Sequence, residues 1–376
     1  MPDATPAAPR HFKWIAALLS IVAAVGLSEA LVRASLFHTT LQFASQDPEY
    51  YARSLDELWI YRHLFSGATT WNVGLLGGQP SNETSIEFYR KWATSLTPDA
   101  ELGYVRAPDI RTPCHETTNL ATRGTGEASW AGPKIVFIGD SFVESAACSN
   151  DTLATKMQKL TGIDTLNFGV GGYGVDQMFL YFKRLAPRCD RKDCLFLIGM
   201  IQDDVGRMLL AVRTAPKPYF TIRDDQLVLH TSHIHPATLN DVFERPPERF
   251  YLYYFLRGRL GYPIYRSLLK ETQAQRLETQ YSLARLIFRD MAALKRQGQF
   301  ELAFVVFPTP GNPFDGKVLA LLRNEGISYV DLQGCLKGTP DADVFAELHP
   351  TSLGNDLLAQ CLVRDLTAMG LVKPQH

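Results

Sequence analysis

The sequence predicts an α/β domain of three layers, in which a parallel sheet lies between two layers of helices, together with one N-terminal membrane helix. Short apolar runs alternate with segments of helical periodicity from residue 134 onward. These runs are apolar throughout, which is typical of parallel strands buried on both faces. The chain has 376 residues, 46% of them apolar, which is enough for one large core with appendages.

The first landmark is the uncharged run from Trp14 to Ser28, which Glu29 follows. It reaches the roughly 20 residues of a spanning helix if residues 30–32 are counted and Glu29 lies near the interface. Arg10 and Lys13 favour a cytoplasmic N-terminus. We therefore expect residues 1–13 in the cytoplasm and an uncleaved signal anchor over residues 14–33. A cleaved signal peptide is the main alternative, although no clean small-x-small cleavage site follows and Arg33 argues against one; a buried core helix is another.

Residues 34–133 are expected to form a lead-in segment packed on the domain. Within it, residues 49–65 carry apolar and aromatic side chains at helical spacing. Residues 98–132 are rich in Pro, Thr and Gly, which predicts a loop.

The domain itself is expected over residues 134–376, where strands and helices alternate. Residues 150 or 151 would cap the first helix. The predicted strands are 134–139, 164–170, 194–201, 301–307 and 328–332, and the predicted helices are 152–160, 175–185, 280–297, 318–325 and 353–369.

An insertion over about residues 206–279 interrupts this alternation. We expect it to cap the active site, because functional loops follow the carboxyl ends of strands. A structural elaboration without substrate contact is the alternative. The insertion contains His230, His233 and His235, for which a surface loop is favoured over a metal site because no acidic ligand pattern accompanies them.

The cysteine count agrees with export from the cytoplasm. Six cysteines are an even number, as disulfides in an oxidising compartment require, but their pairing does not follow from the sequence. Cys189 and Cys194 could close a local loop. A zinc site is disfavoured because no CxxC pair occurs; six ordinary buried thiols are the remaining alternative.

A nucleophile and a base occur where their strands predict a shared edge of the sheet. Ser141 follows the first strand of the domain, at the rim where α/β enzymes bind ligands. A serine hydroxyl needs a base to accept its proton, and His349, just before the last helix, has a suitable intrinsic pKa. Glu347 could orient the imidazole as the acid of a triad does. A turn serine and a capping or core histidine are the alternatives.

Oxyanion donors are expected after the next two strands. A glycine-rich loop over residues 167–174 contains Gly172, where the backbone can approach a substrate closely. Gln202 and Asp203 follow the third strand. The glycines could simply form a tight turn, and the aspartates Asp203 and Asp204 could cap the following segment.

Four ordered blocks, GDSF, NFGVGGYG, IQDDV and ELHPTSLG, resemble those of the SGNH/GDSL hydrolase superfamily over about residues 134–369. The resemblance implies a flavodoxin-like fold, no metal or organic cofactor, and hydrolysis or transfer of ester-linked acyl groups. It also implies Ser141 as nucleophile and oxyanion donor, Gly172 as a second donor and His349 as the base. Asp140 and Gln202 complete the expected binding residues.

The chain departs from the family pattern at two positions. The family's usual third-block asparagine is replaced by Asp203, whose ionised carboxylate cannot donate a hydrogen bond. Either protonated Asp203 or the amide of Gln202 would then serve. The usual acid lies three residues before the histidine, where this chain has Ala346. The acid is then Glu347 or Asp343, or the enzyme is a Ser-His dyad.

These observations predict an extracytoplasmic serine esterase with its catalytic domain in the periplasm or extracellular space. Its expected partners are the membrane and an O-acylated glycan, lipid or small ester. Nucleic acid is disfavoured because the net charge is -1 and no basic stripe occurs. An O-acyltransferase that modifies an envelope polysaccharide, or an inactive domain that binds a glycan or partner, are the alternatives.

Overall fold

The computed structural model describes residues 10–37, 57, 60, 95–189, 193–213, 215–234, 248–261, 273–298, 300–346 and 348–373. The chain divides into two compact units. One comprises residues 1–69 and 246–270, and the other comprises residues 70–245 and 271–376. The predicted insertion is thereby divided between the units, and its role as a cap remains a prediction.

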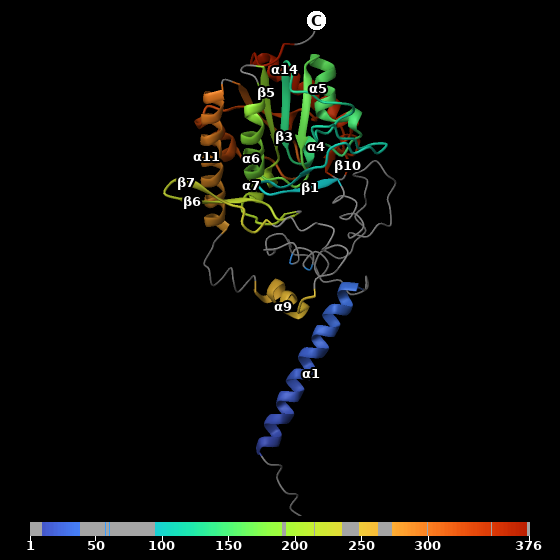
Figure 1. Cartoon of the computed structure of the whole chain (residues 1–376), viewed down its shortest axis with the longest axis vertical. Helices are drawn as coiled ribbons and strands as arrows, with labels where there is room; N and C mark the ends of the chain where they lie inside the picture. The colour runs from blue at the N-terminus through green and yellow to red at the C-terminus, as the bar shows by residue number, and fades with distance from the viewer. Residues whose placement is uncertain are drawn as a thin grey trace, which may run out of the picture. The chain divides into compact units, whose positions relative to one another are not determined.

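The larger unit is built on a five-stranded sheet in the order β4-β3-β5-β8-β9 (Figure 1). Every neighbouring pair in it is parallel. In chain order this is the 2-1-3-4-5 arrangement of flavodoxin-like folds. The predicted fold class is confirmed. The strands are β3 (Lys134–Gly139), β4 (Asp164–Gly169), β5 (Cys194–Met200), β8 (Glu301–Val306) and β9 (Ser328–Asp331).

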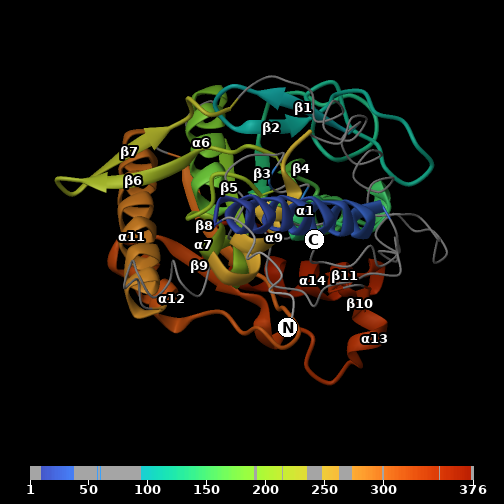
Figure 2. The same cartoon turned by 90° about the horizontal axis from the view of Figure 1, so that it is seen from below.

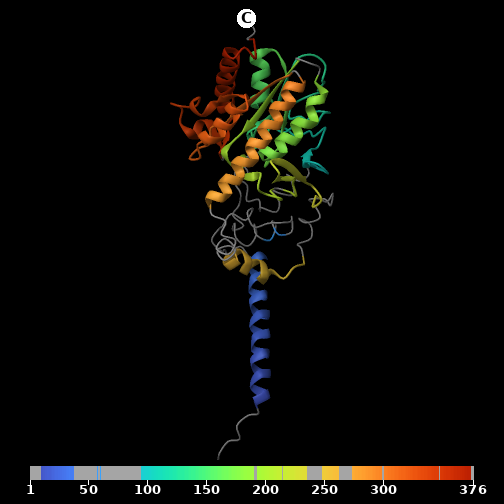
Figure 3. The same ribbon diagram turned by 90° about the vertical axis from the view of Figure 1, so that its left-hand side faces the viewer.

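Helices cover both faces of the sheet because alternate residues of each strand point to opposite sides. Phe137 packs with α5 (Leu153–Thr161) and α14 (Ser352–Ala368) in one core. Phe196 and Phe304 instead meet α6 (Val175–Leu185) and α11 (Gln273–Gly298), with ring centroids 5.1 Å from Phe182 and Phe288. Helix α12 (Gly316–Asn324) packs against α11. The red α14 and the orange α11 lie on opposite sides of the sheet in Figure 3.

Several boundaries differ from the sequence prediction. Helix α11 begins at Gln273 rather than at residue 280. The sequence prediction began it too late because the first two turns are mostly polar and lack a clear apolar periodicity. Thr152, not residue 150 or 151, caps α5, through a hydrogen bond that its hydroxyl accepts from the Thr155 amide. Of the helix predicted over residues 49–65, only Glu57 and Ile60 are described, and both are helical.

The antiparallel strand pairs outside the parallel sheet were not predicted. The strands β1 (Leu96–Asp99) and β2 (Gly103–Arg106) pair within the segment expected to be a loop. The strands β6 (Tyr219–Arg223) and β7 (Gln226–His230) pair within the insertion. The second hairpin lies beside α11 (Figure 2), where Asp225 at its turn pairs with Arg285 and Arg289.

The smaller unit contains α1 (Arg10–Phe37) and α9 (Tyr251–Leu256), which continues into a π-helical turn over Arg257–Gly261. Within α1, Phe12–Ala34 is long and apolar enough to cross a membrane by length and composition. The predicted apolar helix is therefore present, and it begins earlier and ends later than residues 14–33.

The six cysteines form three pairs, Cys114–Cys148, Cys189–Cys194 and Cys335–Cys361. The local loop suggested by the spacing of Cys189 and Cys194 is confirmed. The other two pairs join segments 34 and 26 residues apart, which the sequence could not match with each other.

Candidate active site

The turn after β3 presents Ser141 at the carboxyl end of this strand, which lies between β4 and β5 in the sheet. Asp140 directly follows the strand and caps the short helix α4 (Ser141–Glu144) by accepting a hydrogen bond from the Phe142 amide at 2.8 Å. Ser141 is therefore the first residue of a helix, where the backbone N–H groups have no partner within the helix. Its side chain is part-buried, and its Oγ lies 3.4 Å from Asp140 Oδ2.

His349 lies against this serine although 208 residues separate them. Its Nε2 is 2.8 Å from Ser141 Oγ, which is hydrogen-bond distance. The histidine belongs to β11 (His349–Pro350), a two-residue strand paired with β10 (Phe345–Ala346). Its imidazole also packs on the Phe142 ring, with centroids 5.0 Å apart. These contacts hold the imidazole next to the hydroxyl, as general-base catalysis requires.

The acid of the predicted triad remains a prediction. Glu347 lies outside the described residues. Asp343 belongs to the short helix α13 (Asp341–Val344), where it is exposed and its backbone carbonyl accepts a hydrogen bond from Thr351.

The glycine-rich loop follows β4 and approaches α4 closely. A Cβ at Gly169 would lie 2.2 Å from the Glu144 amide nitrogen, so only glycine fits there. Gly172 has a φ of 83°, in the left-handed region that favours glycine. Between them, the Gly171 amide donates to Glu144 Oε2 at 2.6 Å. This loop therefore has a defined conformation next to α4.

The third block opens α7 (Gln202–Arg207). Gln202 Oε1 accepts a hydrogen bond from the Asp315 amide at 2.8 Å. Asp203 is exposed, and its Oδ1 accepts one from Asn312 Nδ2 at 2.8 Å. Asp204 is buried and caps α7, because its Oδ2 accepts from the Ile201 amide at 2.9 Å. Asp204 therefore caps the helix that follows the third strand of the sequence prediction, which was the alternative to a role in binding the oxyanion.

A buried arginine joins the three blocks that surround Ser141. Arg207 Nη1 lies 3.2 Å from Asp140 Oδ2, donates to the Tyr173 carbonyl at 3.1 Å, and pairs with Asp204 Oδ1. Burial raises the pKa of Asp204 well above its ordinary value, and the nearby charge of Asp140 adds to this while Arg207 opposes it. Burial lowers the pKa of Arg207, but the carboxylates of Asp204 and Asp140 outweigh burial and raise it overall.

Sequence reasoning missed the buried charges that support this site. Besides Arg207, Arg106 from β2 forms an ion pair with Glu144, the residue that holds the Gly171 amide. Asn167 Nδ2 donates to the Val143 carbonyl at 2.8 Å, and its Oδ1 accepts from the Gly169 amide at 2.9 Å. The only available signal was that Glu144 and Asn167 lie within or next to the blocks; nothing in the sequence marks Arg106.

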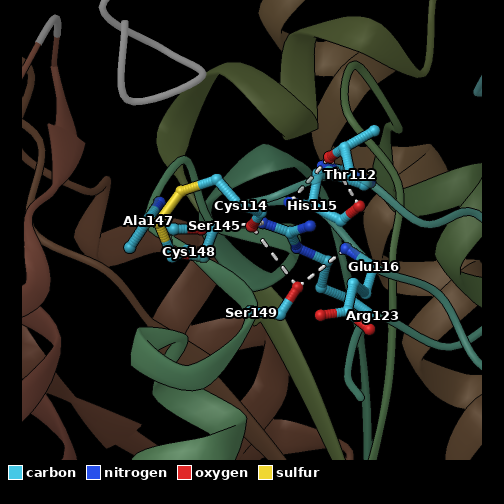
Figure 4. Close-up of a disulfide and its surroundings, with 9 residues drawn as sticks. All are labelled: Thr112, Cys114, His115, Glu116, Arg123, Ser145, Ala147, Cys148 and Ser149. Atoms are coloured by element: carbon cyan, nitrogen blue, oxygen red, sulfur yellow. Dashed lines mark hydrogen bonds between the residues drawn. A yellow bond between two sulfur atoms is a disulfide. The ribbon is translucent and has the colours of Figure 1, made fainter. Parts of the chain in front are cut away.

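A disulfide fixes the chain that leaves α4 (Figure 4). Cys148 is joined to Cys114 of the segment after β2. Around it, Arg123 Nη2 donates to the Ala147 carbonyl at 2.7 Å, and Ser149 Oγ accepts from the Glu116 amide at 2.8 Å. The segment after β2, predicted as a packed loop, is thereby attached next to the candidate site.

The histidine-rich segment has its own contacts. His230 stacks on Tyr219, with centroids 4.8 Å apart, and His233 Nε2 lies 2.8 Å from the Lys217 carbonyl. His235 lies outside the described residues. In the part of the chain that is described, no three His, Cys, Asp or Glu side chains gather as metal ligands.

Comparisons with known proteins returned structures but no sequence relatives. No protein-family model matches the chain, and no curated protein matches it. A lipolytic protein of the G-D-S-L family from Veillonella parvula matches 62% of this chain and 98% of its own, with 11% identity and a TM-score of 0.34.

Two other solved structures belong to acyl-processing enzymes. A lipase/acylhydrolase from Enterococcus faecalis matches 65% of this chain and 99% of its own, with 13% identity and a TM-score of 0.32. The salicylyl-acyltransferase SsfX3 of a tetracycline biosynthetic pathway matches 66% of this chain, with 10% identity and a TM-score of 0.36. This chain spans only 59% of that acyltransferase.

Proposed function

We propose that this chain is a serine esterase that cleaves O-acyl esters through an acyl-enzyme on Ser141. The observation that carries the proposal is the 2.8 Å separation of Ser141 Oγ and His349 Nε2, contributed by segments 208 residues apart. A serine hydroxyl at the first turn of a helix, with an imidazole at hydrogen-bond distance, is the arrangement that serine nucleophiles require.

The mechanism follows from the roles that these groups can take. His349 Nε2 accepts the Ser141 proton as Oγ attacks the ester carbonyl. The oxyanion that forms is stabilised by the backbone N–H groups of Ser141 and Gly172. Collapse of this intermediate breaks the ester bond, and the alcohol leaves with the proton from His349. Water then attacks the acyl-serine by the same route and releases the acid.

The proposed substrate is an O-acylated glycan, lipid or small ester outside the cytoplasm. Segment Phe12–Ala34 would hold the chain in the membrane, with the basic N-terminal flank inside. Three cysteine pairs suit an oxidising compartment. Both observations support a catalytic unit on the periplasmic or extracellular side.

The test is hydrolysis of short- and medium-chain p-nitrophenyl esters by the full chain in detergent. Wild type is compared with Ser141→Ala, His349→Ala and a matched control, Ser129→Ala, at an exposed loop position. The proposal expects turnover that is lost in both site variants and kept in the control. Turnover that survives Ser141→Ala refutes it. Serine acylation by a p-nitrophenyl ester without release would instead indicate a transferase that needs its acceptor.

A further inference from the structure

The C-terminal end of α1 carries two charged residues where a spanning helix would leave the bilayer. Phe12–Ala34 contains 23 residues, about 35 Å of helix, against a hydrocarbon core of about 30 Å. Glu29 and Arg33 lie in its last two turns and form an ion pair at 2.7 Å. A carboxylate at this depth loses hydration, so it needs partners.

The start of α9 supplies those partners. The Glu29 carboxylate accepts hydrogen bonds from the backbone amides of Tyr251 at 3.1 Å and Leu252 at 2.7 Å. Arg33 donates to the Arg249 carbonyl at 2.8 Å, and its guanidinium lies 4.8 Å from the centre of the Tyr251 ring. Figures 1 and 3 show α9 beside this end of α1. Helix α9 is thus attached at the depth where the span ends.

Four other side chains of this segment are large, apolar and exposed, whereas Arg257 and Arg259 carry charge and are partly buried. Tyr251 is buried, but Phe250 is 51% exposed, Tyr253 54%, Leu256 43% and Leu260 57%. Aromatic residues that combine an apolar ring with a polar group concentrate at membrane–water interfaces. A short helix with exposed apolar side chains at such a depth fits the headgroup–acyl boundary, while six residues are too few to span.

We propose that residues 250–260 form a second membrane-contacting element that lies in the interfacial region of the bilayer crossed by α1. This proposal rests on the proposed anchoring of the chain by α1. It adds a second contact between the chain and the lipid. Its occupant is the lipid bilayer itself, because Glu29 and Arg33 hold the start of α9 against the end of α1, whose side chains Leu27 and Leu31 are also apolar and exposed.

The test measures the depth of a fluorophore in lipid vesicles. Tyr253→Cys and Leu256→Cys variants of the full chain are labelled with an NBD group and reconstituted in phosphatidylcholine vesicles. Nitroxide lipids carry the quencher either near the headgroup or near the end of the acyl chain. Val22→Cys reports the span, and Met369→Cys is the matched control at an exposed position of the other unit, 39% exposed.

The proposal expects loss of fluorescence at both α9 positions, stronger with the shallow nitroxide than with the deep one. Val22 should show the opposite order, and Met369 neither effect. Quenching at Val22 together with α9 positions that behave like Met369 overturns the interfacial element and leaves the anchor intact. Absence of quenching at Val22 refutes the anchor itself. Protection of the α9 labels from aqueous iodide without nitroxide quenching would indicate a protein cover, which also overturns the proposal.

Discussion

Replacing Arg207 with methionine tests whether the buried cation stabilises the site. Methionine keeps an unbranched apolar side chain but removes the charge between Asp140 and Asp204, both fully buried. Breaking a buried ion pair by removing one partner costs about 3–5 kcal/mol, because it leaves an uncompensated charge. For a unit of this size the melting temperature should fall by on the order of 10 °C.

The sign of the pH dependence follows from the pKa of Asp204. Its pKa is raised in the folded chain, so the folded state binds this proton more tightly than the unfolded state. The contribution of Asp204 to the free energy of unfolding is therefore fully present below the ordinary pKa of aspartate. It is lost as the pH rises through the pKa that Asp204 has in the folded chain. Arg207 opposes this shift, so its removal raises the pKa of Asp204 further. The deficit of Arg207→Met should be smaller at about pH 5 than at about pH 8.

Thermal and urea unfolding of the full chain in detergent measure this deficit at both pH values. Arg364→Met is the matched control, because Arg364 also forms an ion pair, at 2.7 Å with Asp365, but is exposed. The control should unfold like wild type. An Arg207→Met chain that also unfolds like wild type, or whose deficit does not change with pH, refutes the reasoning.

Two further substitutions test the third block and the segment that carries His349. Asp203→Asn should raise kcat for p-nitrophenyl acetate at least about tenfold, because the introduced amide can donate to the oxyanion. The side-chain oxygen of the introduced asparagine can still accept the hydrogen bond from Asn312. An unchanged or lower kcat contradicts that role. Replacing both cysteines of the Cys335–Cys361 pair, which encloses His349, with alanine should cost about 3 kcal/mol in denaturant unfolding and also lower kcat. The same change at Cys189–Cys194 should leave kcat unchanged, and equal activity losses for both pairs would contradict the argument.

The sequence predicted the sheet well because parallel strands buried on both faces are short apolar runs. Strand β3 and helix α6 match their predicted ranges. The predicted helix ends were wrong where burial of apolar side chains does not determine them. The first turns of α11 are polar, and the start of α5 is set by the hydroxyl of one capping residue. The hairpin β6–β7 was missed because its exposed strands mix polar and apolar residues without a clear pattern.

The approach of Ser141 and His349 was predictable because both follow strands whose carboxyl ends share one edge of the sheet. The supporting charges were not. A buried arginine such as Arg207 looks like any surface arginine in the sequence, and only the three-dimensional contacts show that it joins Asp140 to Asp204. The proposed membrane contact of residues 250–260 could not be predicted from the sequence either, because it depends on hydrogen bonds to Glu29, more than two hundred residues earlier.

The most direct test of the account is covalent labelling of the full chain with a fluorophosphonate, followed by peptide mass spectrometry. We expect one modified residue, Ser141, with no labelling in Ser141→Ala and much slower labelling in His349→Ala. The adduct requires an activated serine hydroxyl but no knowledge of the natural substrate. Absence of an adduct on Ser141, or labelling that is as fast in His349→Ala as in wild type, would contradict the proposed nucleophile and base.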